Sequence, residues 1–317
     1  SLYMIQRAGS GHIGTCFSSA DIVTYLFYEG MGKDDLFFSS KGHDAPLIYS
    51  VLAAKGLIPF DSIHTFRQFD GLPGHPDIRV TPAMVANTGS LGMGISKAKG
   101  IAKADELAGR KRKIYVLMGD GEQNEGQIWE SLQYEHGYYK NIHMFVDHNK
   151  FTMSGPMGHL FINCPQANGH AFSEIQYGIK NRATCFHTIK GKGVPAFEGD
   201  NKYHSGAVSE YKYLYALGKL KEKIPDVKLE TIEVGDSPQI RGGNLGQQYG
   251  LILHDFFGEN DRLVAFDADC LDDHGLRVIQ HHYPERFVEC GIAEQDMVSM
   301  AGGLALGGYI PIVHGFS

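Results

Sequence analysis

The sequence lacks the features that would point to an exported or membrane-bound protein. Its five cysteines show no paired spacing and no secretory signal opens the chain, so we expect no disulfide framework. No uninterrupted apolar run approaches the ~20 residues that a membrane helix needs. We therefore expect a cytoplasmic protein without a membrane partner. The chain also lacks an initial methionine and begins inside a helical pattern, so we expect further residues upstream.

The sequence also has no excess of positive charge. The chain has 29 Lys and Arg against 36 Asp and Glu, a net charge of −7, and the two signs are interspersed, which argues against a nucleic-acid partner. With 317 residues, 43% of them hydrophobic, the chain is long enough for two domains with large cores. Its 40 glycines often stand beside His, Asp or Ser, which favours close approach of the backbone to a ligand.

Residues 113–155 predict a strand, a helix and a second strand. One apolar run, Ile114 to Met118, precedes a Gly-Asp-Gly-Glu turn, and a helical pattern follows from about Glu125 to Tyr138. A second apolar run, Ile142 to Val146, precedes Asp147-His148-Asn149. Such a unit is expected to cross over right-handed with parallel strands. The predicted fold class is therefore α/β, with parallel sheets flanked by helices.

A polar side chain follows each of these strands. Asp120 and Asn149 are 29 positions apart, and both fall beyond the carboxyl end of a strand, where ligands of an open α/β sheet bind. With a backbone carbonyl beyond Asn149 and phosphate oxygens, they suit octahedral Mg²⁺, or Ca²⁺ or Mn²⁺ in its place, with Mg–O distances of roughly 2.0–2.1 Å. Gly119 and Gly121 would let the backbone approach a diphosphate. The alternative is that Gly-Asp-Gly is only a tight turn.

The two halves of this stretch together resemble the cofactor motif of thiamine-diphosphate enzymes. The residues Glu125-Gly126 and Trp129-Glu130 are similar specifically to the transketolase family. The resemblance implies a thiamine-diphosphate-binding fold with thiamine diphosphate and Mg²⁺ as cofactors. It also implies metal ligands and cofactor contacts at Asp120, Asn149, the carbonyl of Phe151, Gly121 and Glu125.

Two histidines near the start of the chain lie among turn residues. Ser10-Gly11-His12-Ile13-Gly14 interrupts a helical pattern, and residues 71–77 hold two prolines and two glycines around His75, which excludes regular structure there. For His12 the alternative is a turn histidine exposed to water. Both segments resemble family loops, one with a His beside thiazolium and substrate and one with a His that contacts the sugar. Ser18 or Ser19 is expected to cap the next helix, Ala20 to Tyr28.

Two further segments resemble cofactor-binding loops. Ser40-Lys41-Gly42-His43 is similar to a family motif whose His touches the diphosphate, so His43 is expected to bind it. Residues 88–94 open a helix rich in Ala and Lys, at whose amino end Gly89, Ser90 and Leu91 are expected to contact the cofactor. A dinucleotide-binding turn is excluded, because G-x-G-x-x-G after a strand is absent.

The second half of the chain adds one histidine and two carboxylates. Tyr203-His204-Ser205-Gly206 resembles the family segment whose His lies near cofactor and substrate. Gly-Ile-Ala-Glu-Gln, with Glu294 as its acid, closely resembles the motif of the glutamate that bonds the pyrimidine ring of the cofactor. A carboxylate favoured at a helix start by the dipole is the alternative for Glu294. Asp269, after the strand Leu263 to Phe266, is expected to be another cofactor contact.

The resemblance divides the chain into two domains. Residues 1–208 would bind diphosphate and Mg²⁺, residues 209–240 would form a linker, and residues 241–317 would begin a pyrimidine-binding domain that is incomplete. Family members continue with the rest of that domain and a third one, so we expect a truncated chain or a partner chain that supplies the rest. The segments near residues 30 and 160 are shorter than in family members.

The activity implied by the resemblance is transfer of a two-carbon ketol unit from a ketose donor to an aldose acceptor through a thiamine-diphosphate ylid. Glu294 would protonate the pyrimidine, and His12, His75 and His204 would polarise substrate hydroxyls or move their protons. The family's cofactor lies between subunits, with Glu125 at that interface, so the expected partner is a second copy in a homodimer.

The substrate is expected to be a sugar or a sugar phosphate. A family serine near the sugar phosphate falls on Asp273, whose carboxylate would repel phosphate, while Arg241 aligns with a phosphate-binding arginine. We therefore expect a non-standard or unphosphorylated sugar. Two alternatives stay open, a 1-deoxyxylulose-5-phosphate-synthase-like enzyme and a catalytically inactive regulatory subunit. The segments 74–76 and 88–92 favour transketolase over the first, and the intact Asp120, Asn149 and Glu294 argue against the second.

Overall fold

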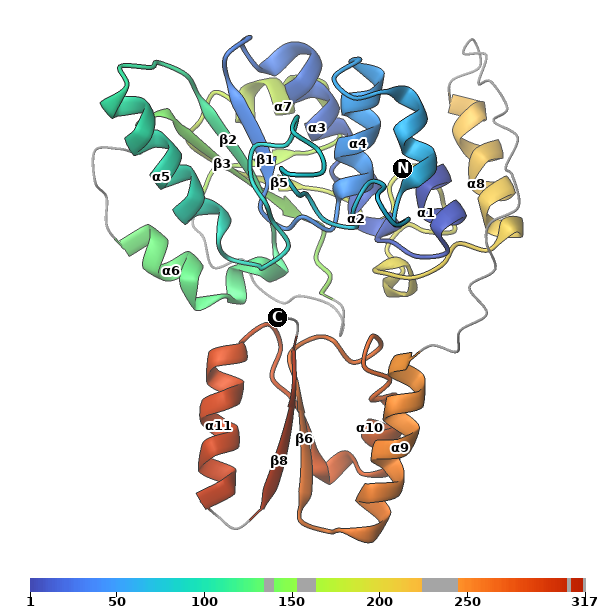
Figure 1. Ribbon diagram of the computed structural model, residues 1–317. Coiled ribbons are helices and arrows are strands. Elements are labelled where there is room, and N and C mark those ends of the chain that lie inside the picture. The colour runs from blue at the N-terminus through green and yellow to red at the C-terminus, as the bar shows by residue number, and fades with distance from the viewer. Residues whose placement is uncertain (134–139, 153–163, 224–244, 307–308, 316–317) are drawn as a thin grey trace. The chain divides into compact units, whose positions relative to one another are not determined.

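The computed structural model describes residues 1–133, 140–152, 164–223, 245–306 and 309–315. The chain divides into two compact units, one mostly within residues 1–237 and one mostly within residues 238–317. The elements of each unit can be followed in Figure 1. In the described part of the chain, no helix is both long and apolar enough to cross a membrane.

The first unit is built on a parallel five-stranded sheet with the order β1-β2-β3-β5-β4. Its strands are β1 (Leu36–Ser39), β2 (Ile114–Gly119), β3 (Ile142–His148), β4 (Gln166–Asn168) and β5 (Ala183–His187). Its helices are α1 (Leu2–Ala8), α2 (Ile13–Ser18), α3 (Ala20–Tyr25), α4 (Ala45–Ala54), α5 (Gly94–Leu107), α6 (Gly126–Gln133), α7 (Phe172–Gly178) and α8 (Glu210–Lys223).

Side chains alternate between the two faces of this sheet, and each face has its own core. Tyr115 and Leu117 of β2 pack with α1 to α4, α7 and α8, whereas Ile114, Val116 and Met118 pack with α5 and α6. In Figure 1, α5 and α6 accordingly lie on the side of the sheet opposite α3 and α4. Because β2 is covered on both faces, it reads in the sequence as a continuous apolar run.

The second unit has a parallel three-stranded sheet with the order β7-β6-β8. Its strands are β6 (Leu263–Asp267), β7 (Phe287–Glu289) and β8 (Ile310–His314), and its helices are α9 (Leu245–Glu259), α10 (Arg277–His282) and α11 (Glu294–Leu306). Helices α9 and α10 share a core with one face of β6, and α11 packs on the other face. The predicted fold class, α/β with parallel sheets in two domains, is confirmed.

The local predictions around β2 and β3 are largely correct. Both strands are present, and α6 occupies the described part of the predicted helix, whose remainder lies outside the described residues. The residues predicted as a helix, Ala20 to Tyr28, are helical throughout, first as α3 (Ala20–Tyr25) and then within a π-helical turn, Leu26–Gly30. The short segment near residue 160 also lies outside the described residues. The predicted domain boundaries at 208 and 240 stay predictions.

The predicted serine cap of α3 is wrong. Ser19 occupies the cap position, but its hydroxyl forms no bond to the helix amides. Instead Ser19 Oγ donates to the Thr15 carbonyl at 2.8 Å and to Asp147 Oδ2 at 3.0 Å, and Ser18 Oγ donates to the same carboxylate oxygen at 2.6 Å. A helix cap would need Ser19 Oγ as an acceptor, but this oxygen already accepts from the Lys41 ammonium at 2.8 Å, a charged hydrogen bond that is roughly twice as strong as a neutral one.

Candidate functional site

The predicted metal ligands of the first unit come together at the carboxyl ends of β2 and β3. In the pairing of β2 with β3, Gly119 lies opposite Asp147, so Asp120 and Asn149 follow the ends of adjacent strands. Asp120 is buried, and its Oδ2 accepts from the Lys150 amide at 2.6 Å and its Oδ1 from the Gly121 amide at 2.8 Å. Asn149 Oδ1 accepts from the Phe151 amide at 3.2 Å. We call Asp120, Asn149 and the Phe151 carbonyl the Asp120 site.

The electrostatics of the Asp120 site fit a divalent cation. Burial, and secondly the neighbouring Asp147 carboxylate, raise the pKa of Asp120 to about 6, which means that the carboxyl lacks a counter-charge of its own. A carboxylate, an amide oxygen and a backbone carbonyl are the hard oxygen donors that Mg²⁺ takes together with phosphate oxygens and water. The described residues contain no group of three or more His, Cys, Asp or Glu side chains that could hold a metal. A metal here would therefore depend on this mixed set of donors.

Two glycine loops meet beside this site. Gly42 has a left-handed φ of +69°, and a Cβ on it would lie 2.7 Å from the Gly89 amide nitrogen. Gly89 has φ +127°, and a Cβ there would lie 3.0 Å from His75 Cδ2. Only glycine fits where two backbones approach this closely. The predicted contacts Gly89, Ser90 and Leu91 thus lie in a loop held against the His43 segment, and α5 begins at Gly94.

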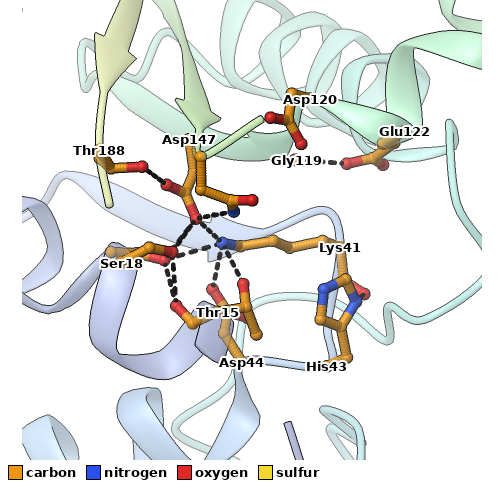
Figure 2. Close-up of polar contacts among 12 residues, drawn as sticks. Thr15, Ser18, Lys41, His43, Asp44, Gly119, Asp120, Glu122, Asp147 and Thr188 are labelled. Carbon is orange, nitrogen blue, oxygen red and sulfur yellow. Dashed lines mark hydrogen bonds and ion pairs between the residues drawn. The ribbon is translucent and has the colours of Figure 1, made fainter. Parts of the chain in front are cut away.

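A buried carboxylate that was not predicted as a site residue fixes these loops. Glu122 Oε1 accepts from the Gly92 amide at 2.8 Å and from Ser40 Oγ, and Oε2 accepts from the Gly119 amide at 3.1 Å. Burial raises the pKa of Glu122. Figure 2 shows Glu122 beside Gly119 and Asp120. The sequence offers one signal for the role of Glu122, its position directly after Gly-Asp-Gly, because an acid next to a glycine turn can reach the loop amides.

The four histidines predicted from separate motifs form one cluster. The ring centroid of His12 lies 5.0 Å from that of His43, 5.8 Å from His204 and 6.4 Å from His75, and His43 lies 6.1 Å from His204. Desolvation, and then neighbouring cationic groups, hold the pKa values of His12 and His43 well below the ordinary range, and desolvation also lowers that of His75. At neutral pH these three rings are therefore uncharged and can accept or donate a proton.

Contacts with the protein orient two of these rings. His43 Nδ1 lies 3.0 Å from the Lys41 carbonyl, which can only accept, so Nδ1 carries the proton. His204 Nδ1 lies 2.6 Å from the ammonium of Lys190, which can only donate, so Nδ1 accepts. Lys190 is buried and was not predicted as a site residue, although a lysine opening a Lys-Gly-Lys-Gly turn after a strand was a usable signal.

A buried ion pair supports both the histidine cluster and the Asp120 site. Lys41 Nζ donates to Asp147 Oδ2 at 2.7 Å and to Thr15 Oγ1 and Ser19 Oγ, each at 2.8 Å. Asp147 also accepts from Ser18 and Thr188 (Figure 2). Burial opposes ionisation of Asp147, but Lys41 and these hydroxyls outweigh it and hold its pKa below the ordinary value. We call these residues the Lys41 network.

A second carboxyl lies close to the Lys41 network. Asp44 Oδ2 is 3.5 Å from Lys41 Nζ, beyond hydrogen-bond length, and neither of its oxygens has a hydrogen-bond partner in the part of the chain that the structure describes. Burial raises the pKa of Asp44, so the single positive charge of Lys41 is shared mainly with Asp147. The single cation, Lys41, therefore lies near two carboxyls, of which Asp147 ionises more readily than Asp44.

Three further predicted site residues come from other segments of the chain. Glu125 is half-buried just before α6. In the second unit, Glu294 is the first residue of α11, and a Cβ placed on Gly315 would lie 3.5 Å from its Cγ. Asp269 has a left-handed φ of +58°, and its amide donates to Glu289 Oε1 at 3.1 Å. A non-glycine residue in this conformation is uncommon and concentrates at functional sites.

Each of the two units contains a segment that matches a domain of known proteins. Residues 1–173 match the thiamine diphosphate binding domain of transketolase, and residues 244–317 match the transketolase pyrimidine binding domain. The chain belongs to the transketolase family. The predicted family and the thiamine-diphosphate-binding fold are thereby confirmed.

The relatives differ in how much of a transketolase they share with this chain. Transketolase of Mus musculus is 30% identical over 96% of this chain, which spans 56% of that protein. An apulose-4-phosphate transketolase subunit of Phocaeicola vulgatus is 32% identical over 72% of this chain, and the match covers 92% of that protein. The structure of transketolase from Campylobacter jejuni has the same fold, with a TM-score of 0.63 at 24% identity, over 99% of this chain and 63% of that one.

Proposed function

We propose that this chain takes part in thiamine-diphosphate-dependent transfer of a two-carbon ketol unit from a ketose to an aldose. The observation that carries the proposal is the combination, within one unit, of the Asp120 site and four clustered histidines. Either feature alone has an ordinary structural explanation. Together they supply an anchor for a metal diphosphate and uncharged proton carriers for a hydroxylated substrate.

Each residue has a role of its own in this proposal. Asp120, Asn149 and the Phe151 carbonyl would hold Mg²⁺, and His43, Gly121 and the loop 89–91 would surround the cofactor. When bound, thiamine diphosphate supplies a carbon acid whose conjugate base can cleave a bond next to a carbonyl.

Proton transfers are assigned to the carboxylate and the uncharged imidazoles. Glu294 would exchange a proton with the pyrimidine ring, and Asp269 and Glu125 would contact the cofactor or its interface. His12 and His75, held uncharged, would take up protons from substrate hydroxyls, and His204 would do so through Nε2 while Lys190 occupies its Nδ1.

We further propose that the working form contains a second chain. The chain spans 56% of the length of mouse transketolase, and its Phocaeicola vulgatus relative is named as one subunit of a transketolase. A homodimer with the cofactor at its interface and a separate partner chain are the two arrangements to distinguish. Light scattering of the purified protein, alone and after co-expression with neighbouring reading frames, would separate them. A strictly monomeric protein that turns over substrate would contradict both.

The proposed substrate is a sugar that is unphosphorylated at the end expected near Asp273. Asp273 is exposed, and the adjacent Asp272 pairs with Arg277 at 2.7 Å, which removes that cation from phosphate binding. Arg241, the expected phosphate ligand, lies outside the described residues. Equal turnover of phosphorylated and unphosphorylated pentuloses would count against this choice of substrate.

Calorimetric titration of thiamine diphosphate, with and without Mg²⁺, tests the central proposal. We expect Mg²⁺-dependent binding to the wild type that Asp120→Ala abolishes, whereas Asp61→Ala, which removes an exposed acid, leaves it unchanged. No binding to folded protein would refute the cofactor assignment. Binding without turnover of any ketose would favour a regulatory subunit, and decarboxylation of pyruvate would favour the 1-deoxyxylulose-5-phosphate-synthase-like alternative.

A further inference from the structure

Arg67 lies between two of the loops that carry the clustered histidines. Its guanidinium donates through Nη1 to Ser10 Oγ, two residues before His12. The same guanidinium packs on the backbone directly before His75, because a Cβ on Gly74 would lie 2.8 Å from Arg67 Nε and 3.2 Å from Nη2. One side chain therefore contacts the segments that lead into both rings.

The backbone of Arg67 has a conformation that needs support from its surroundings. Its φ is +57°, in the left-handed region that residues other than glycine rarely adopt and that concentrates at functional sites. The Arg67 amide donates to the Leu72 carbonyl at 2.7 Å, and a Cβ on Gly71 would lie 2.1 Å from the Thr65 carbonyl oxygen, so the loop closes tightly. This closed loop fixes the direction in which the Arg67 side chain leaves the backbone.

His12 differs from two neighbouring histidines in how its ring is held. Hydrogen bonds with the protein orient the rings of His43 and His204 through Nδ1. In contrast, His12 Nδ1 is buried and has no hydrogen-bond partner in the part of the chain that the structure describes. The position of the His12 ring therefore depends on the position of its loop, which Arg67 contacts through Ser10.

The charge of Arg67 acts on the same two rings. Desolvation is the main cause that lowers the pKa of His75, and Arg67 is the second. For His12, desolvation and then His43 lower the pKa, ahead of Arg67. A guanidinium stays protonated in proteins, so it disfavours the imidazolium form of both rings. The other titratable groups that face these rings are His75, His204 and Lys190 at His12, and Asp44, which acts in the opposite direction, at His75.

We propose that Arg67 is a positioning residue of the candidate site: its guanidinium ties the His12 loop to the His75 loop and is a fixed cation beside both rings. Its value for ketol transfer rests on the proposed function, in which both histidines take up protons from substrate hydroxyls. The tie sets the separation of the two proton acceptors, and the charge favours their neutral forms. Arginine suits both tasks, because its planar fork can bond Ser10 while it lies against Gly74.

Titration of the histidine rings tests the charge without cofactor or turnover. The full chain is labelled with ¹⁵N-histidine, and His12→Gln and His75→Gln identify the two signals in nuclear magnetic resonance spectra. In Arg67→Gln the pKa of both rings should rise towards the ordinary value, whereas in Arg67→Lys it should stay low. Arg79→Gln, which removes an exposed arginine from the segment after His75, should leave both titrations unchanged. Unchanged titrations in Arg67→Gln would overturn the proposal.

A double-mutant cycle tests the tie between the loops. Gly74 does not have a left-handed φ, so alanine suits its backbone, but the new methyl group would push the guanidinium away from Ser10. We expect Arg67→Ala and Gly74→Ala each to lower kcat by about 10- to 10²-fold, the effect of misplacing a reacting group by ~1 Å, with a smaller change in KM. In the double variant the methyl group meets no guanidinium, so the loss should not exceed that of Arg67→Ala. Gly100→Ala, with open space at its Cβ, is the control.

The possible results separate this proposal from the proposed function. Losses of kcat that multiply in the double variant, or wild-type kcat in Arg67→Ala, would overturn the tie. Arg67 is exposed, so its variants should fold, and an unchanged circular dichroism spectrum would verify this. Failure of thiamine diphosphate to bind would refute the proposed function, while the histidine titrations would still show whether the charge of Arg67 acts on both rings.

Discussion

Replacing Lys41 by methionine should be among the costliest substitutions in the first unit. The side chain is 1% exposed, and its ammonium donates to Asp147, Thr15 and Ser19. Methionine has a similar length but leaves the Asp147 carboxylate buried without a counter-charge. Removing one partner of a buried ion pair costs about 3–5 kcal/mol of unfolding free energy. Because Asp147 keeps its bonds from Ser18 and Thr188, we expect about 3 kcal/mol.

The double variant Lys41→Met with Asp147→Asn distinguishes a charge effect from a packing effect. With both charges gone, no ion is left unpaired, so its cost should fall below the sum of the two single costs by about 2–3 kcal/mol.

In Lys41→Met alone, the folded-state pKa of Asp147 rises above its unfolded value. A raised pKa stabilises the folded state at lower pH, so the cost should shrink as pH falls from about 8 to 5.

Urea unfolding followed by the fluorescence of Trp129 is a suitable assay. Trp129 is the sole tryptophan and belongs to α6 of the first unit, with its indole N–H donating to the Gln123 carbonyl at 3.0 Å. Lys103→Met is the matched control, because Lys103 pairs with Glu106 at the surface, which is worth at most about 1 kcal/mol. A Lys41→Met cost under about 1 kcal/mol, or strict additivity in the double variant, would refute the reasoning.

Three further substitutions test other contacts. Gly250→Ala drives a Cβ against a backbone carbonyl and should destabilise the second unit by about 1–3 kcal/mol, measured as faster hydrogen exchange in α9. Asp105→Asn should cost about 1.5–3 kcal/mol in urea unfolding, because two arginines donate to this carboxylate. The pKa of Asp105 is lowered chiefly by hydrogen bonds from Arg112, so the stabilisation by this carboxylate is present at neutral pH and is lost as the pH falls below 3.8. A cost of Asp105→Asn that does not change with pH would contradict this account. Tyr49→Phe removes the hydroxyl that holds the loop around His75 and should cost about 1 kcal/mol in the same assay; no change would show that the loop needs no such bond.

The Asp120 site could be anticipated from the sequence because its geometry follows from two strong local patterns. The runs Ile114 to Met118 and Ile142 to Val146 are short, mostly apolar and followed by turn residues, which favours strands over helices. Once the two strands are parallel neighbours, Asp120 and Asn149 have to emerge at the same edge. The four histidines needed the family resemblance as well, because turns alone do not say which loops meet.

The Lys41 network could not be anticipated, because it has no local signature. Lys41 and Asp147 are 106 residues apart, and a lysine in a polar segment reads as exposed until the fold buries it. Local sequence predicts a cap at Ser18 or Ser19, yet the Ser19 hydroxyl instead bonds to Lys41 and Asp147, which only the fold brings close to it. Likewise, Tyr249 and His314 become partners only when β8 pairs with β6.

The distances along the chain within the Lys41 network also bear on how the protein folds. Asp147 binds Ser18 and Lys41, which precede it by 129 and 106 residues, so these bonds cannot form until β1, β3 and the segment around α2 have aligned. Contacts with such long loop closures tend to form late. We therefore expect the ion pair to form after the folding barrier, so Lys41→Met should speed unfolding more than it slows folding in stopped-flow measurements.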